Sequence, residues 1–176
     1  MGNLWKELPS GPNPPDLLYM IVEIPKGSRN KYEYDKEVGA LRLDRVLYSS
    51  IHYPGDYGFI PQTFYDDGDP LDILVMINEP TFPGCIITVR PIGLFKMFDG
   101  TKPDDKILAV PARDPTFDDV TDIVHVPKHF LAEVAHFFEV YKDLEGIRVH
   151  PIGWEPVEAA KARIEHAIAL YYQKFE

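Results

Sequence analysis

The chain has 176 residues, of which 45% are apolar and 26% are charged, a balance typical of a globular domain with a full core. Its formal net charge of −10 repels the backbone of nucleic acids from most of the surface and argues against a nucleic-acid partner. The single cysteine, Cys85, excludes an internal disulfide. No apolar run has the length of a membrane span, and the first residues lack the apolar core of a signal peptide, so the sequence predicts a cytoplasmic protein without membrane contacts.

The first two thirds of the chain favour strands and turns. Residues 1–16 are rich in proline and predict an extended N-terminal arm with at most one short helical turn. Strands are predicted where apolar residues alternate with polar ones or follow one another directly, at residues 18–24, 31–35, 40–47, 71–77, 86–95 and 106–110.

The pattern changes after about residue 127, where apolar residues recur at helical spacing. Phe130 and Val134 belong to a predicted helix that ends near Gly146, and a second helix is predicted after Trp154. The sequence therefore predicts one α+β domain over residues 1–176, mainly β, in which a barrel or sheet is closed by two C-terminal helices.

Residues 66–72 place four aspartates within seven positions. A glycine and a proline within this segment predict a tight turn, which lets Asp67, Asp69 and Asp72 converge instead of pointing into water. Oxygen ligands of this kind select hard cations such as Mg²⁺ or Mn²⁺. An acidic surface turn without a metal is the alternative interpretation.

A second acidic turn lies between the predicted strands on either side of residues 99–105. Its Asp99 and Asp104 can face one ion, and Glu23 and Glu33 on the early strands can add further oxygens. Basic residues are interleaved with these acids, namely Lys31, Arg45 and Lys106. Metal ions and cationic side chains together can hold a highly charged phosphate, although charged strand edges also form ordinary ion pairs.

Tyrosines accompany the charged residues. Tyr53 and Tyr57 surround a Pro-Gly turn, so both hydroxyls can point into a cleft as donors to phosphate oxygens. Tyr141 and Lys142 offer another phenol beside a cation at the end of the first predicted helix. Each tyrosine also fits a packed aromatic ring with a solvated hydroxyl.

Together these segments resemble the soluble family I inorganic pyrophosphatases, in their prokaryotic type. The hexapeptide Asp67-Gly68-Asp69-Pro70-Leu71-Asp72 looks like the signature of that family. Further segments follow in family order between about residues 18 and 156, namely Glu23-Ile24-Pro25, Lys31-Tyr32-Glu33, Asp44-Arg45, Tyr53-Pro54, residues 57–60, 96–99 and 104–106, and His136-Phe137-Phe138-Glu139 with Tyr141-Lys142. Residues 101–103, Thr-Lys-Pro, depart from the family pattern.

The resemblance implies a five-stranded OB-like β-barrel flanked by helices, and hydrolysis of pyrophosphate to two orthophosphates by a metal-activated water. The cofactor it implies is Mg²⁺, with several ions per subunit and with Mn²⁺ or other divalent ions as substitutes. By position, it implies six metal ligands: Asp67, Asp72, Asp104, Asp99, Glu33 and Glu23. Of these, Asp72 would bridge two ions, and Glu23 would act largely through water.

The resemblance also assigns catalytic roles. Asp69 corresponds to the general base, and Lys31, Arg45 and Tyr57 complete the catalytic group. The residues that would hold the oxygens of pyrophosphate and phosphate are Lys31, Arg45, Tyr57, Lys106, Tyr141 and Lys142, with Tyr53 lining the site.

The prokaryotic members of the family imply a homohexamer of two stacked trimers. The predicted helix around residues 128–143 is the expected contact surface, because its aromatic side chains exceed what a short helix needs for its own core. His136 and Asp143 are seven residues apart and share one helix face, where they can meet across a symmetry axis.

Two other classes of protein remain open from the sequence. A non-catalytic module that binds Mg²⁺ or Ca²⁺ needs only the acidic turn, but it leaves Lys31, Arg45 and Lys106 without a role. An OB-fold nucleic-acid binder has the implied barrel, but the net acidity and the lack of a continuous basic stripe argue against it.

Overall fold

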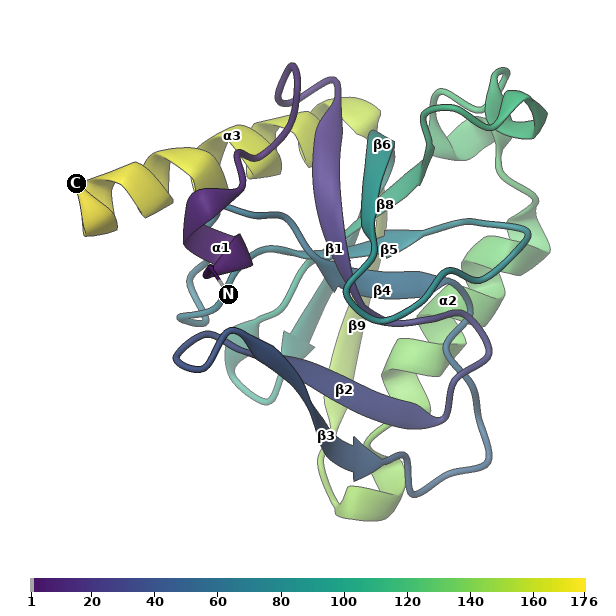
Figure 1. The fold of residues 1–176 in the computed structure, drawn as a ribbon. Helices are drawn as coiled ribbons and strands as arrows, with labels where there is room; N and C mark the ends of the chain where they lie inside the picture. Colours follow the sequence, from purple (N-terminus) through teal and green to yellow (C-terminus); the bar gives the residue numbers. More distant parts are fainter. Residues whose placement is uncertain (1) are drawn as a thin grey trace.

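The computed structural model describes residues 2–176, and Figure 1 shows the arrangement of their elements. The strands are β1 Leu18–Ile24, β2 Asn30–Asp35, β3 Ala40–Val46, β4 Asp56–Phe59, β5 Asp72–Val75, β6 Ile86–Asp99, β7 Lys102–Pro103, β8 Lys106–Pro111 and β9 Val149–Pro156. The α-helices are α1 Leu4–Glu7, α2 Lys128–Val140 and α3 Val157–Phe175, and the 3₁₀ helices are η1 Pro115–Phe117, η2 Ile123–His125 and η3 Asp143–Glu145.

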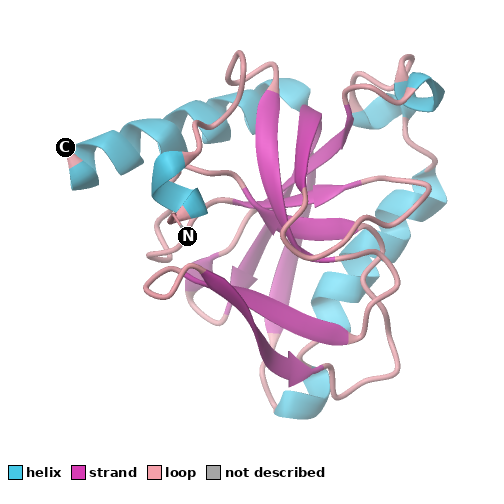
Figure 2. Cartoon of the chain, viewed as in Figure 1, coloured by secondary structure: helices cyan, strands magenta, loops and turns pink. Residues whose placement is uncertain are grey.

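Five strands form a closed ring in the order β1-β4-β5-β8-β6, and β6 pairs back with β1. The pairing of β5 with β8 is parallel, whereas the other four pairings of the ring are antiparallel. The long β6 also carries β7 and β9 on its far half. The predicted α+β class with a five-stranded barrel is therefore confirmed, with the hairpin β2–β3 as a separate two-stranded sheet beside the ring (Figure 2).

Three strands were not predicted from the sequence, β4, β7 and β9, of which β7 is a pair of residues within the predicted acidic turn at residues 99–105. β4 was interpreted as part of a turn, because Pro54 and Gly55 precede it and four buried residues are too few to show alternation. Within β4, Gly58 lies so close to β1 that a Cβ atom there would approach the Ile21 carbonyl oxygen to 1.9 Å. β9 contains prolines that argue against a strand, and it pairs only with β6, at the edge of the sheet.

Both predicted C-terminal helices are present. α2 buries Val134, Phe137 and Phe138 in one core cluster with residues of the ring strands, and α3 buries Ile164 and two alanines in a second cluster with other residues of these strands. No helix in the described part of the chain is both long and apolar enough to cross a membrane.

The N-terminal arm is tied to its own subunit. The arm was predicted as extended, and it contains the single helical turn α1 followed by turns. Trp5 is 5% exposed, packs edge-on against Tyr171 of α3, and donates a hydrogen bond from Nε1 to the Thr63 carbonyl at 2.8 Å.

The aromatic side chains of the helix around residues 128–143 were predicted to face a neighbouring subunit, and this prediction was wrong. Phe137, Phe138 and Tyr141 are 4%, 1% and 5% exposed, so α2 uses its aromatic rings for the core of its own subunit. His136 is exposed on α2, and Asp143 is exposed in η3, beyond the end of that helix.

Candidate active site

A cleft of about 300 Å³ opens between the ring, the hairpin β2–β3 and the C-terminal end of α2. Twelve of the predicted site residues line it: Glu23, Lys31, Glu33, Tyr57, Asp67, Asp69, Asp72, Asp99, Asp104, Lys106, Tyr141 and Lys142. Arg45 lies next to this set, linked to Lys31 through Asp44. Tyr53 was predicted to line the site, but it does not line the cleft. It is 2% exposed and packs against Tyr57, with the two ring centroids 5.4 Å apart.

Three carboxylates form the centre of the cleft. Asp67, Asp72 and Asp104 each offer an oxygen, and these oxygens lie within 4.8 Å of one another. The parallel register of β5 and β8 causes this convergence, because it pairs Asp72 with Lys106 and so brings the beginnings of both strands to one edge of the ring. Asp104 precedes β8, and Asp67 belongs to the turn before β5.

The protonation of these acids reflects burial and mutual repulsion. Burial raises the pKa of Asp67 to about 7 against the hydrogen bond from the Asp69 N–H, and the charges of Asp72 and Asp104 raise it further. Burial likewise raises the pKa of Asp72 to about 6, although Lys106 opposes the shift. A divalent cation would relieve this repulsion, and a set of carboxylate oxygens suits Mg²⁺ or Mn²⁺. The residues present therefore fit the metal that the resemblance implies.

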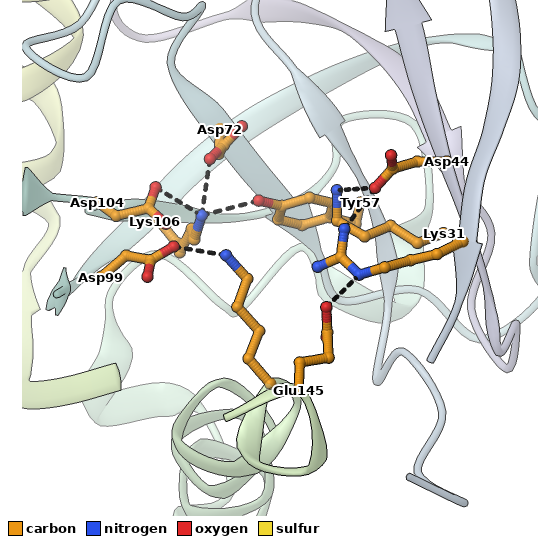
Figure 3. A network of polar contacts seen from close by, with 10 residues as sticks. Lys31, Asp44, Tyr57, Asp72, Asp99, Asp104, Lys106 and Glu145 are labelled. Carbon is orange, nitrogen blue, oxygen red and sulfur yellow. Dashed lines mark hydrogen bonds and ion pairs between the residues drawn. The ribbon is translucent and has the colours of Figure 1, made fainter. Parts of the chain in front are cut away.

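The buried side chain of Lys106 contacts two of the three central carboxylates. Its ammonium group is 3 Å or less from three oxygens: Asp72 Oδ2 at 2.7 Å, Asp104 Oδ1 at 2.8 Å and the Tyr57 hydroxyl at 2.8 Å (Figure 3). Burial alone would lower the pKa of Lys106, but the charges of Asp104 and Asp72 hold it well above its ordinary value. The residue is therefore a permanent cation at the floor of the cleft.

The remaining acids lie around this centre. Glu23 of β1 accepts a hydrogen bond from the Tyr34 backbone N–H at 2.7 Å, and burial raises its pKa to about 8. Asp99, at the end of β6, forms an ion pair with Lys142 just after α2 (Figure 3). This pair joins the second acidic turn to the helical part of the chain.

A basic group forms the side of the cleft toward the hairpin. Arg45 of β3 forms ion pairs with the neighbouring Asp44 and, through Nε at 2.7 Å, with Oε1 of Glu145 in η3 (Figure 3). Lys31 of β2 lies 3.7 Å from the same Asp44 carboxylate. Glu145 was not predicted as a site residue, because no local pattern links a residue after α2 to an arginine on an early strand.

Asp69 is exposed at the rim of the cleft. Its backbone N–H donates to Asp67 Oδ1 at 2.9 Å, which fixes the turn, and its own Oδ1 forms an ion pair with Lys36 Nζ at 2.8 Å. Lys36 was not predicted as a site residue either; it lies in the turn between β2 and β3, on the hairpin that borders the cleft.

The comparisons with known proteins agree with this arrangement. A family model described as inorganic pyrophosphatase matches residues 20–172. The chain belongs to the inorganic pyrophosphatase family. An inorganic pyrophosphatase from Haloferax volcanii is 53% identical over 176 residues, which cover 99% of both chains, and one from Halobacterium salinarum is 52% identical with the same coverage. The resemblance drawn from the sequence motifs is thus confirmed.

The fold of this chain also matches that of solved inorganic pyrophosphatases. The crystal structure of the inorganic pyrophosphatase from Thermus thermophilus superimposes with a TM-score of 0.94 at 45% identity, covering 97% of this chain and 99% of that one. The ring, the flanking hairpin and the C-terminal helices are therefore shared across most of the length of both chains.

The raised pKa of Asp67 leads to a prediction for the metal-free protein. The folded state holds the Asp67 proton more tightly than the unfolded state, so this residue's contribution to stability is lost as pH rises from its ordinary pKa of 3.8 through about 7. Asp67→Asn removes the charge but keeps an oxygen that can accept from the Asp69 N–H. We expect its melting temperature to exceed that of the wild type at pH 8, with a smaller gain at pH 5.

The control is Asp66→Asn, which changes the neighbouring exposed carboxylate. Both variants are measured by thermal unfolding in the presence of a chelator. An equal gain at the two pH values, or no gain from Asp67→Asn at pH 8, contradicts the proposed electrostatic cost.

Proposed function

We propose that this protein hydrolyses inorganic pyrophosphate to two orthophosphates in a reaction that depends on Mg²⁺, within one catalytic domain over residues 1–176. The observation that carries the proposal is the juxtaposition of Asp67, Asp72 and Asp104 with the buried cation Lys106 in one cleft. Membership of the inorganic pyrophosphatase family supports the choice of substrate.

Three carboxylates are proposed as the main ligands of the metal, Asp67, Asp72 and Asp104. Asp99 and Glu33 would hold further ions, and Glu23 would act through water. Bound Mg²⁺, or Mn²⁺ in its place, neutralises phosphate charge and lowers the pKa of a coordinated water from about 15.7 toward 7.

The basic and phenolic groups are proposed to bind phosphate oxygens. Lys106 contributes a fixed positive charge at the floor, and Lys31, Arg45 and Lys142 contribute charges around it. Burial raises the pKa of Tyr57 well above its ordinary value, and burial also raises that of Tyr141. Both phenols therefore stay protonated at neutral pH and can donate hydrogen bonds to an anion.

Asp69 is proposed as the general base. It lies at the rim of the cleft, two residues after Asp67 in the same acidic turn, and it can accept the proton that the attacking water loses. The ion pair with Lys36 holds its carboxylate in place. Arg45 and the lysines then meet the charge that grows on the departing phosphate.

A non-catalytic module that binds Mg²⁺ or Ca²⁺ is the second candidate, since the three carboxylates alone would suffice for it. It leaves unexplained why Lys106, Lys142 and Tyr57 point into the same cleft. Phosphate release from pyrophosphate, measured with Mg²⁺ and again after its removal by a chelator, separates the two. We expect release only with Mg²⁺; metal binding without any release supports the module instead.

Asp69→Asn tests the assignment of the base. The amide cannot accept the proton, so we expect turnover to fall by about 100-fold or more, the usual range for general base catalysis. Affinity for Mg²⁺, measured by isothermal titration calorimetry, should change little because Asp67, Asp72 and Asp104 are intact. Asp66→Asn is the matched control in the same turn, and near-normal turnover in Asp69→Asn refutes the role.

We further propose a cytoplasmic homohexamer built from two trimers. Support comes from apolar side chains that the single subunit leaves exposed on β3, η3 and β9, namely Leu43, Val46, Leu144 and Ile152. His136 and Asp143 are exposed near the C-terminal end of α2 and are free to make polar contacts between subunits.

Light scattering of the wild type and of His136→Ala between pH 5 and pH 8 tests the assembly. Histidine is the side chain that most readily changes its charge in this range, so we expect the balance of hexamer and trimer in the wild type to change between these two pH values. His136→Ala should lose this response. A monomer under all conditions refutes the assembly, and an identical response in both proteins excludes His136 from it.

A further inference from the structure

We propose that Arg163 of α3 is a positioning residue that fixes the two acidic turns of the site relative to each other. The inference rests on the proposed metal function and concerns a residue outside the cleft. Arg163 contacts one residue beside each turn, Asp105 and Tyr65, and neither of these has a role in the proposed chemistry.

The first contact reaches the turn that carries Asp104. Arg163 Nη2 lies 2.9 Å from Asp105 Oδ2, and Asp105 is 3% exposed. The other oxygen of Asp105 accepts a hydrogen bond from the Met97 backbone N–H of β6 at 3.3 Å. Asp105 therefore ties Asp104, its neighbour in the chain, both to the ring and to α3.

The second contact reaches the turn that carries Asp67. The guanidinium carbon of Arg163 lies 5.0 Å from the centre of the Tyr65 ring, and this ring is 2% exposed. The backbone of Tyr65 forms two hydrogen bonds with the acidic turn. Its N–H donates to the Asp69 carbonyl at 2.8 Å, and its carbonyl accepts from the Gly68 N–H at 3.0 Å. A shift of Tyr65 would therefore move Asp67 as well.

Arg163 itself belongs to a rigid part of the molecule. On either side of it along α3, Ala160, Ile164 and Ala167 are 0% exposed. The Ala167 carbonyl also accepts a hydrogen bond from the Phe64 N–H at 2.9 Å, so the segment before the acidic turn is docked on the same helix. A planar guanidinium can pair with a carboxylate through its edge and contact an aromatic ring through its face at once. One side chain thus sets the separation of Asp67 and Asp104.

A positioning role and simple electrostatics predict opposite effects on metal affinity. Arg163→Met removes a positive charge, and the loss of a positive charge near a cation site strengthens cation binding. If Arg163 instead holds the ligands in place, its loss separates them and weakens binding. The sign of the change therefore decides between the two.

Calorimetric titration of the substrate-free protein with Mg²⁺ provides the test. We expect Arg163→Met to weaken Mg²⁺ binding by about tenfold, the lower end of the range for residues that orient metal ligands. Lys161→Met is the charge-matched control on the same helix, because it breaks the exposed Lys161–Asp16 ion pair, and neither of these residues lines the cleft. This control should bind Mg²⁺ as the wild type does.

A separate control distinguishes a change in Mg²⁺ affinity from a loss of protein stability. Ile164→Val loosens the packing of α3 next to Arg163 and should lower the melting temperature without changing Mg²⁺ affinity. Tyr65→Leu keeps an apolar side chain at the turn but removes the ring, so we expect it to weaken Mg²⁺ binding as Arg163→Met does. Arg163→Lys keeps the charge without the planar group and should give an intermediate affinity.

Unchanged or tighter Mg²⁺ binding in folded Arg163→Met overturns the inference. Equal weakening by Ile164→Val also overturns it, because the effect would then follow from stability alone. Should Arg163→Met fail to fold, Arg163→Lys and Tyr65→Leu provide the same comparison. A wild type that binds no Mg²⁺ refutes the proposed metal function itself, which distinguishes that failure from a failure of the positioning role.

Discussion

The buried ammonium group of Lys106 is the interaction on which the rest of the site depends. It is 3% exposed and touches Asp72, Asp104 and the Tyr57 hydroxyl, so the ring strands β4, β5 and β8 all meet at one charge. Without it, carboxylates brought this close would repel one another in a poorly solvated place. Even with it, burial and then the charges of Asp72 and Asp104 raise the pKa of Asp67 to about 7. The subunit thus holds more negative charge in the cleft than Lys106 neutralises, and a bound metal cation would neutralise the remainder.

The barrel provides this arrangement through one unusual pairing. Antiparallel neighbours place the beginning of one strand beside the end of the next, whereas the parallel pair β5–β8 places two beginnings together. Each of these beginnings is preceded by an acidic turn, so both turns open on the same side of the ring. Apart from Lys106, the basic groups of the cleft come from elements outside the ring: Lys31 lies on the hairpin β2–β3, and Lys142 follows the end of α2.

Local patterns predicted most of the architecture. The bounds of β1 and the positions of both C-terminal helices follow directly from apolar periodicity, and the acidic turns were recognisable because glycine and proline accompany the aspartates. β4 and β9 were not predictable in this way, since one is too short to show alternation and the other contains prolines that only an edge position tolerates. Glu145, Lys36 and Arg163 were missed for a different reason. Their partners Arg45, Asp69 and Asp105 are distant in sequence, and pairing between distant charges depends on the whole topology.

The order of the strands along the chain has a consequence for synthesis on the ribosome. Asp67 and Asp72 leave the exit tunnel before Lys106, and the ring closes only when β8, which ends at Pro111, lies between β5 and β6. A nascent chain that ends before this point has the acids without their cation and a barrel with an open side, and closing it requires contacts between distant segments. α3, which contacts a residue beside each acidic turn, is translated after both turns and after β8. The acidic centre therefore cannot take its final form until these later segments have been translated.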